Sequence, residues 1–256
     1  MTHTIFTLAR FALLEGLRTR MALLVLFVLG AGLGFSWLAG QVAITETAQI
    51  QAALMASFLR FAAVFILAAF VVISQARESA DKGLDMLLSL PQPRSAYYLG
   101  KLAGFIVAGW LLALVFGLPL MLFSPAANAL LWTVSLGLEL SIVAAASLFF
   151  VTTLTQVPAA LAALLGFYVL SRAMAALQLI GGSSLIDDQS FAPKIVRVLL
   201  DSIAAVLPRL DLFTQSAWLT QSTAPSGVLG NIVGQAVIYV VLLTAAGLID
   251  LHRKNF

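Results

Sequence analysis

The chain contains no cysteine and only two histidines. Without cysteine the chain forms no disulfide, no thiolate metal site and no cysteine nucleophile. Cysteine usage therefore does not indicate whether the compartment is oxidising or reducing. The histidines, His3 and His252, lie at opposite ends of the chain. They cannot supply the paired ligands of a zinc membrane protease, and the acid pair Asp187-Asp188 is isolated from both, so we predict no metal site.

Charged residues are scarce as well. They make up 10% of the sequence, whereas 61% is hydrophobic, and soluble proteins carry roughly 25% charged residues. This composition predicts an integral membrane protein. The net charge is +3, but the basic residues occur singly and form no stripe, so they indicate membrane topology and not a nucleic-acid partner.

Six apolar runs are long enough to cross a hydrocarbon core about 30 Å thick. The sequence therefore predicts an all-α protein with six transmembrane helices in a single transmembrane domain, residues 1–256. The predicted spans cover residues 21–40, 52–74, 102–123, 129–151, 159–180 and 228–249. The first run is too long for a cleaved signal core, so we expect the amino terminus to remain attached.

Two of the boundaries lie within largely uncharged sequence. The stretch 102–138 carries no charge and is too long for one crossing. Pro119, Ser124, Pro125 and Asn128 mark a tight turn within it. A second break at residues 152–158 ends in Pro158, which suits the first turn of the fifth span.

The residues before the first span, 2–20, are compatible with a helix throughout and mix charged with apolar side chains. We expect an interfacial helix lying along the membrane. The alternative is that these residues extend the first span into the cytoplasm.

The basic residues outside the spans predict the orientation. Nine lie on the side of the termini and three on the other: Arg10, Arg18, Arg20, Arg77, Lys82, Arg94, Lys101, Arg253 and Lys254 against Lys194, Arg197 and Arg209. By the positive-inside rule both termini of this multi-pass protein are predicted to be cytoplasmic. The loop 181–227 is then the largest outer segment.

That outer loop has two notable parts. Residues 193–206 show apolar side chains at helical spacing, which favours a surface helix. Residues 212–219 are apolar enough to dip back into the membrane as a re-entrant segment. Packing on the outer ends of the spans predicts the same pattern.

The densest charged stretch, residues 77–101, separates the second and third spans. Leu84, Leu87 and Leu88 lie at i, i+3 and i+4, with acidic residues on the other side, so residues 78–90 are predicted to form a short amphipathic cytoplasmic helix. Arg94 and Lys101 follow where cations favour the lipid headgroups and the cytoplasmic foot of the third span. A surface helix of this kind either docks a cytoplasmic partner or lies on the membrane without one.

This stretch resembles the permease subunits of ABC transporters of the type 2 exporter family. The family loop runs acid, glycine, leucine, acid, two leucines, proline, a basic residue and a Gly-Lys pair. The matching residues here are Glu78, Leu84, Asp85, Leu87, Leu88, Pro91, Arg94, Gly100 and Lys101. Asp85 stands where Glu is commoner, and Gly83 lies one residue closer to the acid than is usual.

The resemblance implies that the helix docks a separate cytoplasmic ABC ATPase that binds ATP and Mg²⁺. The docking residues would be Glu78, Gly83, Leu84, Asp85, Leu87, Leu88, Pro91 and Arg94. The chain itself would bind no cofactor, in keeping with the absence of a GxxxxGK[ST] phosphate loop from the sequence. Two permease copies, identical or related, would line an export path in the lipid membrane, with room for a periplasmic accessory protein.

Three charges lie inside the predicted spans: Arg60, Glu139 and Arg172. Burial of an isolated charge costs at least a few kcal/mol, so each needs a partner or water. We expect the acid near mid-depth and both bases in the outer half. They can form structural salt bridges between spans, or they can line a polar path or a dimer interface.

The sequence gives less support to other classes of function. A non-transporting assembly or maturation factor, for example for a cofactor or a copper enzyme, is compatible with the same features. An intramembrane enzyme is not favoured, because Ser141 and Ser147 have no histidine or lysine in the membrane to activate them. We predict no catalytic residue. Aromatic residues near span ends, including Trp37, Trp110, Trp132, Tyr97 and Tyr98, are expected to be interface anchors.

Overall fold

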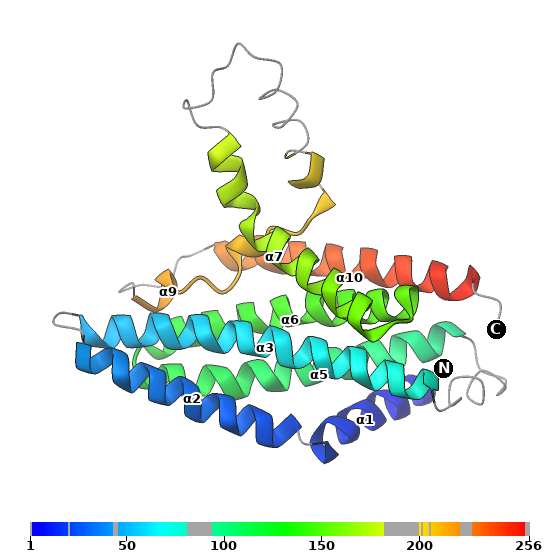
Figure 1. Cartoon of the computed structure of the whole chain (residues 1–256), viewed down its shortest axis with the longest axis horizontal. Coiled ribbons are helices and arrows are strands. Elements are labelled where there is room, and N and C mark those ends of the chain that lie inside the picture. Colours follow the sequence, from blue (N-terminus) through cyan, green and yellow to red (C-terminus); the bar gives the residue numbers. More distant parts are fainter. Residues whose placement is uncertain are drawn as a thin grey trace, which may run out of the picture.

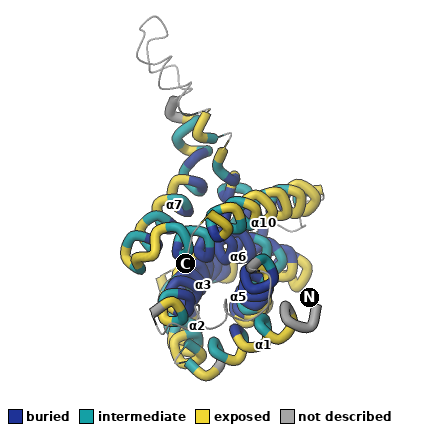
Figure 2. Tube along the Cα trace, turned by 90° about the vertical axis from the view of Figure 1, so that its right-hand side faces the viewer, coloured by how far each residue is buried: buried dark blue, intermediate teal, exposed yellow. Residues whose placement is uncertain are grey.

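The helix α6 (Ala126–Leu154) forms the centre of the molecule, and the other long helices pack around it. The structure is a computed structural model, and it describes residues 2–19, 21–42, 46–80, 94–181, 200, 202–204, 206–220 and 227–253. Most of α6 is buried over its whole circumference, as the dark trace in Figure 2 shows. A helix that is apolar on all sides is stable only where neighbours or lipid cover every face.

Six helices are long and apolar enough to span a membrane, as predicted. They are α2 (Met21–Val42), α3 (Thr47–Ala80), α5 (Arg94–Gly117, continued by the 3-10 turn η1, Leu118–Leu122), α6, α7 (Val157–Gly181) and α10 (Val228–Arg253). The remaining elements are α1 (Thr2–Arg18), η2 (Leu210–Leu212) and α9 (Ala217–Thr220). No strand occurs in the part of the chain that the structure describes.

Several helices extend beyond their apolar runs. α3 begins five residues before the predicted span and continues six residues past it, and α5 begins eight residues early, at Arg94. The predicted limits followed hydropathy, but arginine, lysine and glutamate are good helix formers and continue a helix beyond the hydrocarbon. Helix length and apolar length therefore differ most where α3 and α5 approach the 81–93 segment.

The two ends of the bundle differ in the turns and termini that they carry. The α2–α3 and η1–α6 turns lie at one end, which we call the hairpin end, and both termini lie at the opposite, terminal end (Figure 1). Pro125 is the N-cap of α6, so the predicted turn is confirmed there, although Asn128 lies inside the helix and is buried. α7 starts at the terminal end and leaves the bundle towards its C-terminal end (Figures 1 and 2).

The first helix, α1, is separate from α2 and packs mainly on α5. The crossing depends on small residues, because a Cβ atom on Gly104 of α5 would lie 2.8 Å from the Cβ of Ala12 and 2.9 Å from the carbonyl of Ala9. Small residues at a contact allow the backbones of two helices to approach closely, and membrane helices associate in this way. The alternative in which α1 merely extends the first span is wrong.

Three of the aromatic residues predicted as interface anchors are buried in the bundle. Trp132, Tyr98 and Tyr97 are 0%, 1% and 7% exposed. Their ring faces fill space between helices, where aromatic side chains contribute large packing areas. Trp37 is exposed, as an interface anchor would be.

The orientation predicted from the basic residues can be tested directly because the chain has no cysteine of its own. Ala126→Cys places a thiol at the hairpin end and Gln156→Cys places one at the terminal end, and both positions are exposed. We expect a membrane-impermeant maleimide to label Ala126→Cys in intact cells, whereas Gln156→Cys reacts only after the cells are opened. The reverse labelling pattern would refute cytoplasmic termini.

Candidate functional site

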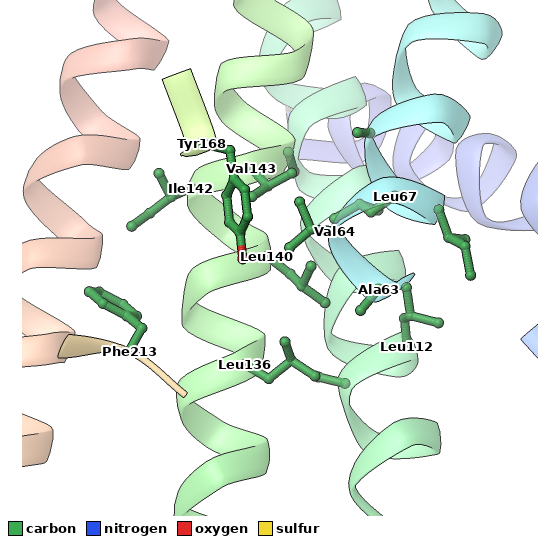
Figure 3. Packing of buried hydrophobic residues seen from close by; sticks show 14 of the residues in the cluster. Ala63, Val64, Leu67, Leu112, Leu136, Leu140, Ile142, Val143, Tyr168 and Phe213 are labelled. Carbon is green, nitrogen blue, oxygen red and sulfur yellow. The ribbon is translucent and has the colours of Figure 1, made fainter. Parts of the chain in front are cut away.

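Glu139 lies near the middle of α6 and has no solvent exposure. An ionised carboxylate in such a place is strongly destabilising unless several donors and a positive charge surround it. Apolar side chains fill this part of the bundle: Leu136, Leu140 and Val143 of α6 pack with residues of α3, and Tyr168 and Phe213 approach from other elements (Figure 3).

Three side chains from outside α6 satisfy the carboxylate. The hydroxyl of Tyr168 donates to Oε1 at 2.8 Å, and a guanidinium nitrogen of Arg172 lies 3.3 Å from the same oxygen. The hydroxyl of Thr214 donates to Oε2. Tyr168 and Arg172 are four residues apart on α7, so both project from the same face of that helix.

Thr214 belongs to residues 207–220, which we call the return segment. This segment contains η2 and α9 and is irregular between them. Leu210, Phe213, Thr214, Trp218 and Leu219 are all buried. Non-helical backbone inside a membrane protein needs partners within the protein, because lipid offers none.

Two arginines supply those partners. Arg172 donates to the carbonyl oxygens of Leu210 at 2.8 Å and Phe213 at 3.2 Å, and Arg60 of α3 donates to that of Thr214 at 3.1 Å. Arg60 also lies over the ring of Phe61, 4.7 Å from its centroid. Planar guanidinium groups with several donors suit this task better than a lysine.

The backbone at Thr214 adopts a left-handed conformation, with φ of 44°. This region is unfavourable for a β-branched residue and costs about 1–3 kcal/mol. The conformation is held from two sides, since the Thr214 amide donates to Ser135 Oγ at 2.9 Å while the side chain binds Glu139. Further along, Ser216 and Ser57 of α3 share a hydrogen bond of 2.9 Å.

The return segment reaches deep into the bundle. Thr214 contacts Arg60 and Glu139, and each of these lies thirteen residues after its helix begins at the hairpin end. Thirteen helical residues correspond to about 20 Å along the axis. Of the two alternatives for residues 212–219, the structure favours a segment that dips between the spans over packing on their outer ends.

The predicted convergence of Arg60, Glu139 and Arg172 agrees with these contacts, which also assign the pairing. Glu139 pairs directly with Arg172, whereas Arg60 binds the return segment. Sequence reasoning missed Tyr168, Thr214 and Ser135. Only Tyr168 carried a usable signal, its position one turn before Arg172 on an otherwise apolar helix.

The two serines considered as nucleophiles bind the backbone of their own helix. Ser141 and Ser147 donate to the backbone carbonyls of Gly137 and Val143, one turn earlier on α6. No group of three or more metal-ligating side chains occurs among the described residues.

The proposed docking residues lie mostly outside the described part of the chain. Gly83, Leu84, Asp85, Leu87, Leu88 and Pro91 fall within 81–93, so the predicted helix there stays a prediction. Glu78 is described near the end of α3, and Arg94 begins α5. The two helix ends that flank the loop are therefore both visible.

An ion pair joins these helix ends. Lys101 Nζ lies 2.6 Å from Glu78 Oε2, and the side chains are 7% and 17% exposed. Lys101 was expected where cations favour lipid headgroups and the foot of the third span; it lies in the first turns of α5, with its side chain buried beside Glu78. Beside it the Gln75 amide donates to the Tyr97 hydroxyl at 2.9 Å, and Ser74 donates to Glu15 of α1 at 2.7 Å.

Comparison with known proteins adds no assignment: no protein-family model matches the sequence, and no curated protein is significantly similar to it.

The Glu139–Arg172 pair can be tested by a double-mutant cycle. We expect Glu139→Gln and Arg172→Met each to lower the free energy of unfolding by roughly 3–5 kcal/mol, because each leaves buried polar partners behind. The double variant should lose less free energy of unfolding than the sum of the two single losses, since neither charge then remains unpaired. Denaturant unfolding in mixed micelles measures both effects, and Glu46→Gln, an exposed acid, is the control. Strict additivity would contradict the pairing.

The Glu78–Lys101 pair allows a charge exchange. Glu78→Lys and Lys101→Glu should each destabilise the protein by roughly 1–3 kcal/mol, less than a fully buried pair because Glu78 retains solvent contact. Combining the two reversals should restore most of the loss of thermal stability. Failure of the exchanged pair to recover it would show that the ion pair contributes little.

Proposed function

We propose that this chain is the permease subunit of an ATP-driven exporter of the type 2 ABC family. The observation that carries the proposal is the Glu78–Lys101 ion pair, at 2.6 Å. Both residues are positions of the motif, and together they hold the end of α3 beside the first turns of α5. The loop between them thus starts and ends on two helix ends that the ion pair holds together. A segment that transmits force from a partner needs such fixed ends.

The partner in this proposal is a cytoplasmic ATPase that binds ATP and Mg²⁺. Leu84, Leu87 and Leu88 form its contact face, with Glu78, Gly83, Asp85, Pro91 and Arg94 shaping the loop around them. Two features support it: the leucine spacing, and the sequence's lack of a phosphate loop, which leaves nucleotide hydrolysis to another subunit.

The permease is proposed to act as a pair of copies, identical or related, in the bacterial inner membrane with its termini in the cytoplasm. Support comes from α2 and α10, of which only 11% and 17% of the most apolar windows are buried within the chain. These faces need lipid or another subunit to cover them. A periplasmic accessory protein would meet the hairpin end.

A second function has a specific observation in its favour. The return segment fills the bundle at the level of Glu139 and is hydrogen-bonded on several sides. A closed core of this kind also suits a membrane assembly or maturation factor that couples an ATPase to a partner protein without bulk transport. ATPase stimulation by a transported compound in the reconstituted complex favours the exporter, whereas ATPase activity that responds only to a protein partner favours the second function.

Site-specific crosslinking tests the docking face. Because the chain has no cysteine, Leu87→Cys carries a unique thiol. After purification from native membranes, we expect a thiol-to-amine crosslinker to join it to a protein that binds ATP. The matched control is Gln156→Cys, exposed at the same end of the bundle on the α6–α7 turn.

Charge substitutions complete the experiment. Changing Leu84, Leu87 and Leu88 to glutamate should remove the ATPase from the purified complex while the permease stays folded, because charged side chains are excluded from an apolar contact. Equal crosslinking at residues 87 and 156, or a complex that survives the three substitutions, would sink the docking assignment.

A further inference from the structure

A groove of about 200 Å³ opens at the terminal end between α1, the start of α2 and α3. α1 ends at Arg18 and α2 begins at Met21, and the two helices run in different directions (Figure 1). They therefore leave a strip of α3 uncovered between them. The apolar lining consists mainly of Met21, Leu24, Phe65, Ile66, Phe70 and Ile73.

The groove has the length of one membrane leaflet. On α3 it extends from Phe65 to Arg77, twelve residues or about 18 Å of helix, close to half of a hydrocarbon core about 30 Å thick. Its walls are open to the side, since Phe65 is 56% and Leu24 48% exposed. Both residues belong to membrane-spanning helices, so the groove faces lipid.

The mouth of the groove carries one charge of each sign. Arg77 lies in the last turn of α3, is exposed and forms no ion pair with any described residue. Glu15 lines the same mouth, and its Oε2 accepts a hydrogen bond from Ser74. A carboxylate accepts several hydrogen bonds, so Oε1 remains an acceptor for a cationic donor.

We propose that this groove is a binding site for phosphatidylethanolamine from the leaflet at the terminal end. One acyl chain lies along α3, the phosphate binds Arg77 and the ammonium donates to Glu15. Charge complementarity selects the headgroup, because a guanidinium and a carboxylate at one mouth match a phosphate and a primary ammonium. The site is independent of the docking loop and of the export function.

Native mass spectrometry of the delipidated full chain with single added phospholipids tests the proposal. We expect wild type to retain phosphatidylethanolamine in preference to phosphatidylglycerol, which lacks the ammonium, and to phosphatidylcholine, which lacks N–H donors. Arg77→Ala should weaken retention of phosphatidylethanolamine about tenfold, the effect of one lost charge-assisted contact. Glu15→Gln should reduce the preference over phosphatidylglycerol about threefold.

Two further variants test whether lipid retention depends on this groove and on Arg77 in particular. Arg253→Ala removes an exposed arginine from the last turn of α10 at the same end of the bundle and should change nothing. Ala69→Phe fills the groove without altering its charges and should abolish retention. Equal binding of all three lipids, or retention that survives Ala69→Phe, would overturn the proposal.

A second copy of the chain is the competing occupant. If it covers the groove about a two-fold axis, with the two Phe65 side chains facing each other, Phe65→Cys will form a disulfide-linked dimer under mild oxidation. Any such disulfide joins two introduced thiols, because the wild-type chain has no cysteine. We expect Phe65→Cys to form no disulfide-linked dimer and to lose its maleimide reactivity when phosphatidylethanolamine is added. A disulfide-linked dimer would refute a lipid occupant.

Discussion

A carboxylate at the centre of a helix that is buried on every side has to be neutralised by groups that other elements bring to it. Glu139 sets this condition, and the arrangement around it follows. α7 must approach α6 closely enough for Tyr168 and Arg172 to reach the acid, and the return segment must descend far enough for Thr214 to do the same. The acid thus joins segments that are far apart in the sequence.

Arg172 and Arg60 then divide two tasks. Arg172 pairs with the acid, and donors of both arginines satisfy carbonyl groups of the return segment that would otherwise lack partners in an apolar interior. A charge within a span is usually read as part of a path for a polar substrate. Here the same charges also make an irregular segment compatible with burial.

The spans were predictable because each is a long apolar run, and the convergence of the three charges was predictable because buried charges need partners. Thr214 was not, since its contact with Glu139 crosses 75 positions of sequence and leaves no periodic signal. The ion pair of Lys101 was missed for a similar reason: its partner Glu78 lies on another helix. Trp132 and Tyr98 were assigned to the membrane interface from their position near span ends, but neighbouring helices cover them.

The position of Glu139 also has a consequence for biosynthesis. A ribosome completes α6 before it has made Tyr168, Arg172 or Thr214, so the acid is synthesised ahead of these three partners. Arg60 lies on the earlier helix α3, but its own partner, the carbonyl of Thr214, also comes later. The contacts that satisfy the carboxylate can therefore form only after Thr214 has been translated, late in the synthesis of the chain.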